Sequence, residues 1–349
     1  MEKKEDIRLL NSGELEKIFT TKNQKKYRVD QVLDWLWNKG IDSFSQMSNL
    51  SDNLIRLLDK KFVLKKPIEI KSYKSSDGTI KYSIQLYDGN YVEAVLIPNK
   101  NRITACLSSQ VGCSLDCKFC ATSKLVRKRN LLFYEIFDHL FYLNEQSKTL
   151  FKKKISNVVF MGMGEPLLNY SNLVKAIRKI KLKRGLNFSP KKITISTSGI
   201  PKLIKNIAHE DLNCNLAISL HSAIQKTREV IMPFSKKFTL EDLIDSLKYW
   251  YRITKKKILY EYIIFDGIND DIEHIRAFVK ICKILPCKVN FIEYNSIGDK
   301  KYRQAKAEKL YLYQKHLNDE GIVNTLRISR GRDIKAACGQ LINFNEVGK

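Results

Sequence analysis

The sequence lacks any long apolar segment and any recognisable leader. None of its hydrophobic runs reaches the roughly 18 residues that a membrane-spanning helix needs, and residues 1–6 are mostly charged, unlike a signal peptide. These absences predict a cytoplasmic protein that makes no membrane contact and keeps its thiols reduced. Solenoid repeats and low-complexity segments are missing as well. A hydrophobic content of 44% over 349 residues is nevertheless enough for a sizeable core.

Acidic residues are scarce relative to basic ones. The chain has 62 Lys and Arg against 37 Asp and Glu, which gives a net charge of +25. Such an excess attracts polyphosphates largely without regard to their sequence, so it favours a nucleic-acid partner. An AT-rich genome would produce the same Lys-rich composition without any ligand, and that alternative stays open. The basic clusters are Lys124 with Arg127, Lys128 and Arg129, residues 152–154, residues 181–184 and residues 255–257.

The sequence also lacks a second pair of closely spaced cysteines. Cys113, Cys117 and Cys120 follow a strand-like run and are separated by three and two residues. A structural zinc site needs a fourth Cys or His, often in a second close pair. Three thiolates can instead hold a [4Fe–4S] cube that keeps one iron open for a small molecule, which implies redox or radical chemistry. Zinc and disulfides remain as alternatives, although disulfides are rare in reduced compartments.

From about residue 104 onward, short β-branched runs alternate with amphipathic stretches. This alternation predicts an α/β core with a parallel sheet, open or barrel-like, whose functional groups gather at the carboxyl ends of the strands. The predicted strands are residues 103–108, 157–161, 192–196, 216–220, 258–264, 288–292 and 325–328. The predicted helices are residues 133–146, 172–182, 201–208, 240–254, 271–285 and 306–319.

The first 100 residues have a different character. Residues 1–65 show helical periodicity without strands. Residues 67–98 have the pattern of strands, with hairpin turn signals at residues 76–78 and 88–90. We therefore predict three parts, which are a helical accessory domain at 1–65, a β extension at 66–100 and the α/β core at 101–349.

Polar motifs follow several of the predicted strands. Gly164 and Glu165 lie in a Gly-rich turn, where glycine lets a ligand approach the backbone and the carboxylate can accept a hydrogen bond from an ammonium group. Other polar positions end or follow the later strands and could bind a ribose or a carboxylate. They are Ser196, the segment Ser219-Leu220-His221, and Asn295. Taken singly, each of them is better explained as an ordinary cap.

Two cysteines outside the triplet have surroundings that suggest chemistry. Cys338 lies among small residues near Arg330 and Arg332, which favours a flexible electropositive loop and a thiolate. Cys106 lies in the first predicted strand of the core. If both face the same mouth of the sheet, they form a nucleophile and a resolving thiol. The cysteines interpreted as small apolar side chains are Cys214 and, in a helix-like stretch, Cys282 and Cys287.

Several motifs together resemble those of a known family. They are Ser109-Gln-Val-Gly-Cys113, the cysteine triplet, Met161-Gly-Met-Gly-Glu-Pro-Leu-Leu-Asn169, Ser219-Leu-His221 and Ala336-Ala-Cys-Gly-Gln-Leu341. Over almost its whole length the chain is similar to the radical S-adenosylmethionine (radical SAM) RNA adenine methyltransferases. The triplet marks the radical SAM superfamily, and the last motif together with Cys106 is typical of the RNA-modifying branch. The resemblance implies a partial (β/α)6 radical SAM barrel.

The resemblance also implies cofactors and a role for each motif. Cys113, Cys117 and Cys120 would bind a [4Fe–4S] cluster whose open iron takes the amine and carboxylate of S-adenosylmethionine, with two molecules used per turnover. Cys338 would be methylated first and, after a 5′-deoxyadenosyl radical removes a hydrogen atom, would deliver the carbon to adenine. Cys106 would resolve the protein–RNA adduct through a disulfide with Cys338. Cofactor contacts are implied for Gly164, Glu165, Ser196, Ser219, Leu220, His221 and Asn295.

The substrates implied by the resemblance are RNAs. They are an adenine in the peptidyl-transferase region of 23S rRNA and the adenine 3′ of the anticodon in certain tRNAs, each methylated at carbon 2. Residues 1–65 would then be an RNA-binding accessory domain, and Glu93 matches a proposed proton acceptor. A low-potential electron donor such as flavodoxin or ferredoxin is implied, and we expect a monomer.

Three other functions stay open. They are methylation of carbon 8 of the same rRNA adenine by a sister enzyme, a zinc-bearing RNA-binding protein, and a radical enzyme that acts on a small metabolite. Glu165-Pro166 and Ser329-Arg-Gly331 favour carbon 2 over carbon 8. The chain departs from the family pattern at Ser123 and Val126, where glycine is usual, and at Ser296, where proline is common. These departures put the geometry of the loops in question.

Overall fold

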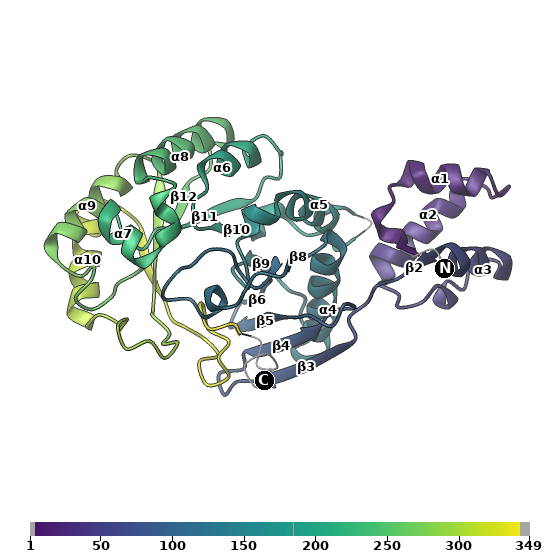
Figure 1. Cartoon of the computed structure of the whole chain (residues 1–349), viewed down its shortest axis with the longest axis horizontal. Helices are drawn as coiled ribbons and strands as arrows, with labels where there is room; N and C mark the ends of the chain where they lie inside the picture. The colour runs from purple at the N-terminus through teal and green to yellow at the C-terminus, as the bar shows by residue number, and fades with distance from the viewer. Residues whose placement is uncertain (1–3, 184, 343–349) are drawn as a thin grey trace.

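A single open sheet of ten strands forms the centre of the computed structural model, which describes residues 4–183 and 185–342 (Figure 1). Residues 1–3 of the first predicted domain, Arg184 of a basic cluster, and 343–349 of the predicted core lie outside the described residues. In spatial order the strands are β14 (Asn324–Arg327), β13 (Cys287–Ile292), β12 (Ile258–Ile263), β11 (Asn215–Ser219), β10 (Ile193–Thr197), β9 (Asn157–Phe160), β6 (Arg102–Cys106), β5 (Tyr91–Asn99), β4 (Ile80–Gln85) and β3 (Glu69–Lys74).

The strands from β6 to β14, which form the larger part of this sheet, are parallel. Six strand–helix units are followed by β14, and within the described residues β14 and β3 form two unpaired edges, so the barrel stays open. This confirms the predicted α/β class, and each predicted strand ends within two residues of an observed one. The helices are α1 (Ser12–Thr20), α2 (Tyr27–Asp34), α3 (Asp52–Lys61), α4 (Phe133–Phe151), α5 (Tyr170–Lys181), α6 (Pro201–Ile207), α7 (Gln225–Ile231), α8 (Leu240–Thr254), α9 (Ile272–Cys282) and α10 (Ala307–Asp319).

The structure corrects the sequence prediction at four places. α4 continues to Phe151 rather than ending at residue 146, and α7 was not predicted. Cys287 begins β13 and does not belong to a helix, because α9 ends at Cys282. The N-terminal part is not free of strands, since the two-residue strands β1 (Glu5–Asp6) and β2 (Phe62–Val63) pair in parallel.

An antiparallel meander extends the sheet beyond β6. β3 pairs with β4 and β4 with β5, and the two predicted hairpin turns join them. Each turn contains a glycine with positive φ, +85° at Gly78 and +81° at Gly89, a conformation that side chains with a Cβ disfavour. β5 then pairs antiparallel with β6, so the meander and the parallel part share one continuous sheet.

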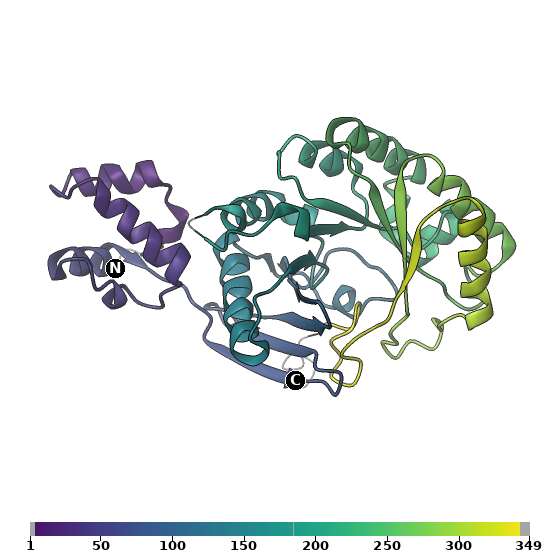
Figure 2. The ribbon, with the colours of Figure 1, turned by 180° about the vertical axis from the view of Figure 1, so that it is seen from behind.

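The N-terminal helices lie to one side of the sheet (Figures 1 and 2). A buried ion cluster joins them to α4, because Arg8 donates to the carboxylates of Asp6 and Asp138, while Lys66 lies 3.0 Å from Asp138. The Arg8 guanidinium also lies 4.2 Å from the centre of the Tyr134 ring. Breaking a buried ion pair costs about 3–5 kcal/mol, so this cluster fixes where the N-terminal part sits on α4.

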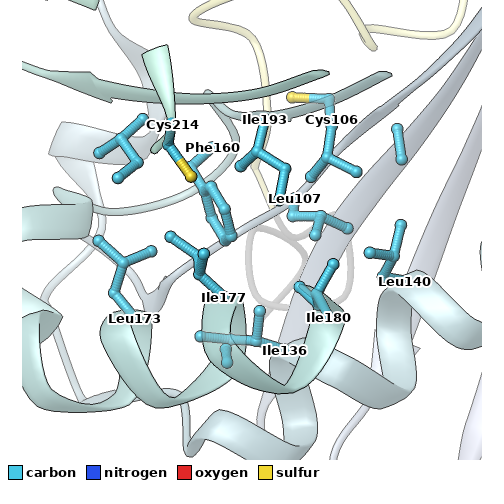
Figure 3. Close-up of a cluster of buried hydrophobic side chains, with 14 of the residues drawn as sticks. Cys106, Leu107, Ile136, Leu140, Phe160, Leu173, Ile177, Ile180, Ile193 and Cys214 are labelled. Atoms are coloured by element: carbon cyan, nitrogen blue, oxygen red, sulfur yellow. The ribbon is translucent and has the colours of Figure 1, made fainter. Parts of the chain in front are cut away.

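Apolar side chains between the sheet and its helices hold the strands that carry the site. Figure 3 shows Phe160 and Ile193 of the sheet against Leu173, Ile177 and Ile180 of α5, and all five are buried. Burying such a side chain contributes about 1.5–3 kcal/mol. Among the described residues no helix is long and apolar enough to cross a membrane.

Candidate active site

The three clustered cysteines lie in one loop after β7 (Gln110–Val111), at the carboxyl end of β6. They pack with apolar residues that include Phe119, Phe265 and Tyr294. All three thiols are free, and burial raises the pKa of each, to about 12 for Cys113. Cys117 interacts electrostatically with both Cys120 and Cys113, so the sulfurs share one neighbourhood.

The donor set of this loop fits an iron–sulfur cluster better than a single ion. Within residues 4–183 and 185–342, no group of three or more His, Cys, Asp and Glu is arranged to hold a metal ion. Cluster thiolates each bind a different iron and therefore stand farther apart than the ligands of one zinc. The three thiols of this loop lie in an apolar pocket and match a cube with one open iron, while Cys338, which also packs against this pocket, comes from a distant loop.

Ser123, one of the departures from the family pattern, lies directly against the cysteine loop. Its hydroxyl lies 2.5 Å from the carbonyl oxygen of Cys117 and 2.7 Å from that of Cys120. These contacts stabilise the turn that presents the two cysteines. The second departure, Val126, is 84% exposed, and Ser296 accepts a backbone hydrogen bond from Gly298. None of the three disrupts the loop that carries the cysteines.

A cavity of about 140 Å³, here named the cluster-side cavity, adjoins the cysteine loop at the carboxyl ends of the strands. Most of the predicted site residues line it. They are Cys117, Cys120, Gly164, Glu165, Ser196, Ser219, His221, Asn295 and Cys338. Four predicted residues are not among its lining. The Leu220 side chain lies in the hydrophobic core, Cys113 packs against the apolar cluster around the other two cysteines, and Cys106 and Glu93 lie elsewhere.

The Gly-rich turn positions Glu165 in the wall of this cavity. Its carboxylate accepts hydrogen bonds from the backbone N–H groups of Leu167 at 3.1 Å and Ser198 at 2.8 Å. Burial raises the pKa of Glu165, and the Ser198 hydrogen bond opposes that rise. Glycine is required at 164 because φ is +93° and a Cβ would lie 2.5 Å from the side chain of Gln110. The positive φ and the close approach of Gln110 therefore explain the glycine at this position, which also lines the cavity.

His221 is held in a single orientation at the end of β11. Its φ of +53° is unusual for a residue with a side chain, and its Nδ1 accepts from the Ile263 backbone N–H at 3.1 Å. The Phe119 ring meets the imidazole edge-on at 4.8 Å between ring centres. Burial lowers the pKa of His221 to about 3, so the ring stays neutral with its proton on Nε2.

The loop that carries Cys338 is bound to the site by hydrogen bonds. Asn295 donates to the carbonyl oxygen of Cys338 at 3.2 Å and accepts from Arg332 at 3.0 Å. The Ala121 N–H donates to the Gly339 carbonyl at 2.7 Å, which joins this loop to the cysteine triplet. The expectation of a flexible loop was therefore wrong, and the amide of Asn295 is already used in holding Cys338.

Cys338 also lines a second cavity, here named the Cys106 cavity, of about 380 Å³. Cys106, Glu261 and Arg327 line it too, and the Cys338 thiol interacts electrostatically with Cys106 and with Arg327. Burial raises the pKa of Cys106 to about 12. Arg327 of β14 is thus a cation next to Cys338 that the sequence did not suggest, while Arg330, which the sequence did suggest, lines the same cavity. Arg332 instead forms an ion pair with Glu293 at 2.6 Å.

Glu261 is a second residue that sequence reasoning missed. It lines both cavities, one carboxylate oxygen accepts from Asn290 at 3.1 Å, and the other has no hydrogen-bond partner among the described residues. Burial raises its pKa, and Arg327 opposes that rise. The sequence did contain a signal. Glu261 stands between Tyr260 and Tyr262 in a strand expected to be buried, and charged side chains are rarely buried without a partner or a function.

Glu93 lies apart from both cavities. It is buried on β5, where one carboxylate oxygen lies 3.0 Å from Lys81 Nζ. Burial raises the pKa of Glu93 to about 7, although Lys81 opposes the rise. The backbone of Ile342, four residues after Cys338, donates a hydrogen bond to it. Glu93 therefore contacts the end of the cysteine loop rather than the thiols.

The basic clusters lie on two different faces. Residues 152–154, 181–183 and 255–257 follow the carboxyl ends of α4, α5 and α8, where cations interact favourably with the helix dipole. That face is opposite the cysteine loop, since each helix returns to the start of the next strand. Only Lys124, Arg127 and Lys128 lie exposed beside the triplet. Arg129 forms ion pairs with Asp88 and Glu135.

Comparisons with known proteins agree with this geometry. A family model described as the radical SAM superfamily matches residues 107–279, and one described as a ribosomal RNA large subunit methyltransferase N-terminal domain matches residues 6–64. A probable dual-specificity RNA methyltransferase RlmN of Flavobacterium johnsoniae is 51% identical, with 97% of each chain covered. A similarly named protein of Cytophaga hutchinsonii is 44% identical, covering 97% of this chain and 93% of that one. The crystal structure of a radical SAM methyltransferase from Sphaerobacter thermophilus superposes with a TM-score of 0.90 at 30% identity, covering 97% of this chain and 99% of that one.

The open parallel sheet and the three-cysteine loop define a radical SAM enzyme, a class that carries a [4Fe–4S] cluster and binds S-adenosylmethionine. Within that class, the chain belongs to the RlmN family of dual-specificity RNA methyltransferases. This membership excludes the zinc-bearing, non-catalytic alternative and removes the support for a small-metabolite substrate.

Proposed function

We propose that this chain methylates carbon 2 of an adenine in 23S rRNA and of the adenine 3′ of the anticodon in certain tRNAs. The observation that carries the proposal is the position of Cys338, which lines both the cluster-side cavity and the Cys106 cavity. A methyl carrier must face the methyl donor on one side and the acceptor base on the other. Carbon 2 of adenine is electron-poor and has no acidic proton, so radical addition suits it better than polar transfer.

Each residue has a defined task in this scheme. The cluster and S-adenosylmethionine, when bound, supply a methyl group and a 5′-deoxyadenosyl radical. Cys113, Cys117 and Cys120 hold the cluster, while Glu165 and His221 form part of the wall of the cluster-side cavity, where S-adenosylmethionine would bind. Other members of that wall are Gly164, Ser196, Ser219 and Asn295, and we propose Leu220 as a further cofactor contact by resemblance.

The thiols of Cys338 and Cys106 carry out the remaining steps of the reaction. Cys338 carries the methyl carbon to adenine, and its sulfur becomes part of a covalent adduct. The adduct loses one electron to an external acceptor and the carbon-2 proton to a base, and the Cys106 thiolate then attacks the Cys338 sulfur. The electron pair of the S–C bond stays on the carbon, which takes up a proton and becomes the methyl group. The Cys106–Cys338 disulfide that forms is reduced by an external reductant before the next turnover. An external low-potential donor, such as flavodoxin or ferredoxin, supplies the electron for the radical step. We further propose a cytoplasmic monomer with the three-part division 1–65, 66–100 and 101–349.

Nucleoside analysis tests the carbon position. Reconstituted enzyme is incubated anaerobically with unmodified 23S rRNA or tRNA, and the RNA is digested and separated by mass spectrometry. We expect 2-methyladenosine in both RNA types. Finding only 8-methyladenosine would assign the chain to the sister activity. Finding neither product, although the cluster is loaded and active, would contradict the proposal.

Glu93 gives a prediction about pH. A proton acceptor works in its ionised form, and the ionised fraction of Glu93 rises as the pH passes its pKa of about 7. The rate of adduct resolution should therefore rise from about pH 6 to about pH 8 and then level off. In the Glu93→Gln variant, single-turnover resolution should be slower by about 100-fold or more, and this rise should disappear. An unchanged pH profile in the variant would show that another group accepts the proton.

A further inference from the structure

Arg228 is a buried cation next to the cysteine loop. It lies on α7, is 0% exposed, and its guanidinium lies 5.4 Å from the centre of the Phe234 ring. Its Nη2 donates to the Ser198 carbonyl at 2.6 Å, and its Nε donates to the Leu220 carbonyl at 3.3 Å. The cysteine loop rests on the end of the same helix, because the Lys118 N–H donates to the Ile231 carbonyl at 3.0 Å.

No acidic group balances this cation within the part of the chain that the structure describes. The Nη1 atom of Arg228 has no hydrogen-bond partner, and the only group that opposes the loss of its charge is the thiol of Cys117. Burial lowers the pKa of Arg228 to about 10. Arg8 is equally buried but has carboxylate partners in Asp6 and Asp138. The two arginines differ in whether their charge is compensated.

An uncompensated buried charge costs several kcal/mol, so a cation at this place needs an anion. A [4Fe–4S] cube with three thiolates is net negative and gains one further negative charge on reduction. The cysteine loop contacts α7 through the hydrogen bond from the Lys118 N–H to the Ile231 carbonyl, so Arg228 of the same helix lies close enough to interact electrostatically with Cys117. Net charge near a cluster is one of the factors that set its reduction potential.

We propose that Arg228 is a positioning residue whose charge compensates the cluster and raises its reduction potential, so that an external donor can reduce it by one electron. The Ser198 and Leu220 carbonyls hold the guanidinium in place, and Nη1 remains available to the cluster. The inference rests on the radical SAM membership of the chain and not on which carbon is methylated.

The reduction potential is the direct test. Reconstituted wild type, Arg228→Met and Arg228→Lys are titrated with dithionite and mediators, in the absence of RNA, while the reduced cluster is followed by electron paramagnetic resonance. We expect Arg228→Met to shift the midpoint to a more negative value and Arg228→Lys to recover most of that shift. Iron and sulfide contents are measured to confirm equal loading.

Thermal stability gives a second readout that does not depend on electron transfer. The melting temperature of each variant is compared with wild type in the cluster-free and cluster-loaded states. Because only the loaded state contains the anion, Arg228→Met should lower Tm more in the loaded than in the cluster-free protein. Arg8→Met is the matched control, and its loss of Tm should be the same in both states.

Three results would overturn the proposal. One is an unchanged midpoint in Arg228→Met together with equal losses of Tm in both states. A second is an unchanged midpoint with weaker binding of S-adenosylmethionine alone, which would assign the guanidinium to the cofactor. If Arg228→Met fails to load its cluster, Arg228→Gln takes its place as the uncharged variant. A midpoint of Arg228→Lys as negative as that of Arg228→Gln would then also contradict the proposal, because restoring the charge would have had no effect. Since no RNA is used, these outcomes are independent of the proposed methylation.

Discussion

Cys338→Ala should bind the cluster and S-adenosylmethionine and yet produce no methylated RNA. The substitution removes the only thiol that lines both cavities. It should leave the loop in place, since Asn295 and Ala121 bind the carbonyl groups of Cys338 and Gly339. Product is measured by mass spectrometry of RNA nucleosides, and loading by iron content and the visible spectrum.

Cys287→Ala is the control for this variant. Cys287 is a free, half-buried cysteine on β13 whose thiol contacts the carbonyl and the thiol of Cys282, and it lines neither cavity. It should methylate RNA as the wild type does. Normal product from Cys338→Ala would remove the carrier role from that residue and require another methyl acceptor.

Cys106→Ala should accumulate a covalent enzyme–RNA species. Without its thiol nothing attacks the sulfur of Cys338, so the adduct stays intact under denaturing conditions. The strand itself should persist, because Cys106 pairs with Val95 and Val159 through the backbone. A shifted band on a denaturing gel, sensitive to both nuclease and protease, is the expected observation.

The double variant Cys106→Ala/Cys338→Ala separates the two thiols. It should give no shifted band, since the adduct needs the Cys338 sulfur. If the single variant releases free protein and methylated RNA at the wild-type rate, Cys106 is not the resolving thiol. A shifted band in the double variant would mean that the cross-link forms at another residue.

Local patterns explain how well the strands could be predicted. β12 and β13 are short β-branched and aromatic runs bounded by polar residues, and their predicted ends differ from the observed ones by one residue at most. α7 was not predicted because it is only seven residues long, between Ile224 and Pro233, and its hydrophobic periodicity is too short to recognise. The extension of α4 to Phe151 depends on contacts that its sequence alone does not specify.

The site was less predictable than the fold for a physical reason. Cys113, Cys117 and Cys120 are close in sequence, so their spacing predicts their common purpose. Two cations of the site come from distant elements: Arg228, which acts on Cys117, from α7, and Arg327, which acts on Cys338 and Cys106, from β14. Burial of an arginine is a property of the assembled fold, and neither residue carries a local signal. For the same reason, the positive charge near Cys338 was assigned from the sequence to Arg330 and Arg332, its neighbours in the chain.

The hydrogen bonds between the two cysteine loops have a consequence for damage by oxygen. The Ala121 N–H and the Thr122 hydroxyl donate to the carbonyls of Gly339 and Leu341, each at 2.7 Å. An enzyme that loses its iron should therefore lose the alignment of its carrier thiol too. Loss of the cluster should thus stop the reaction before Cys338 can react with RNA, so that no covalent protein–RNA species accumulates.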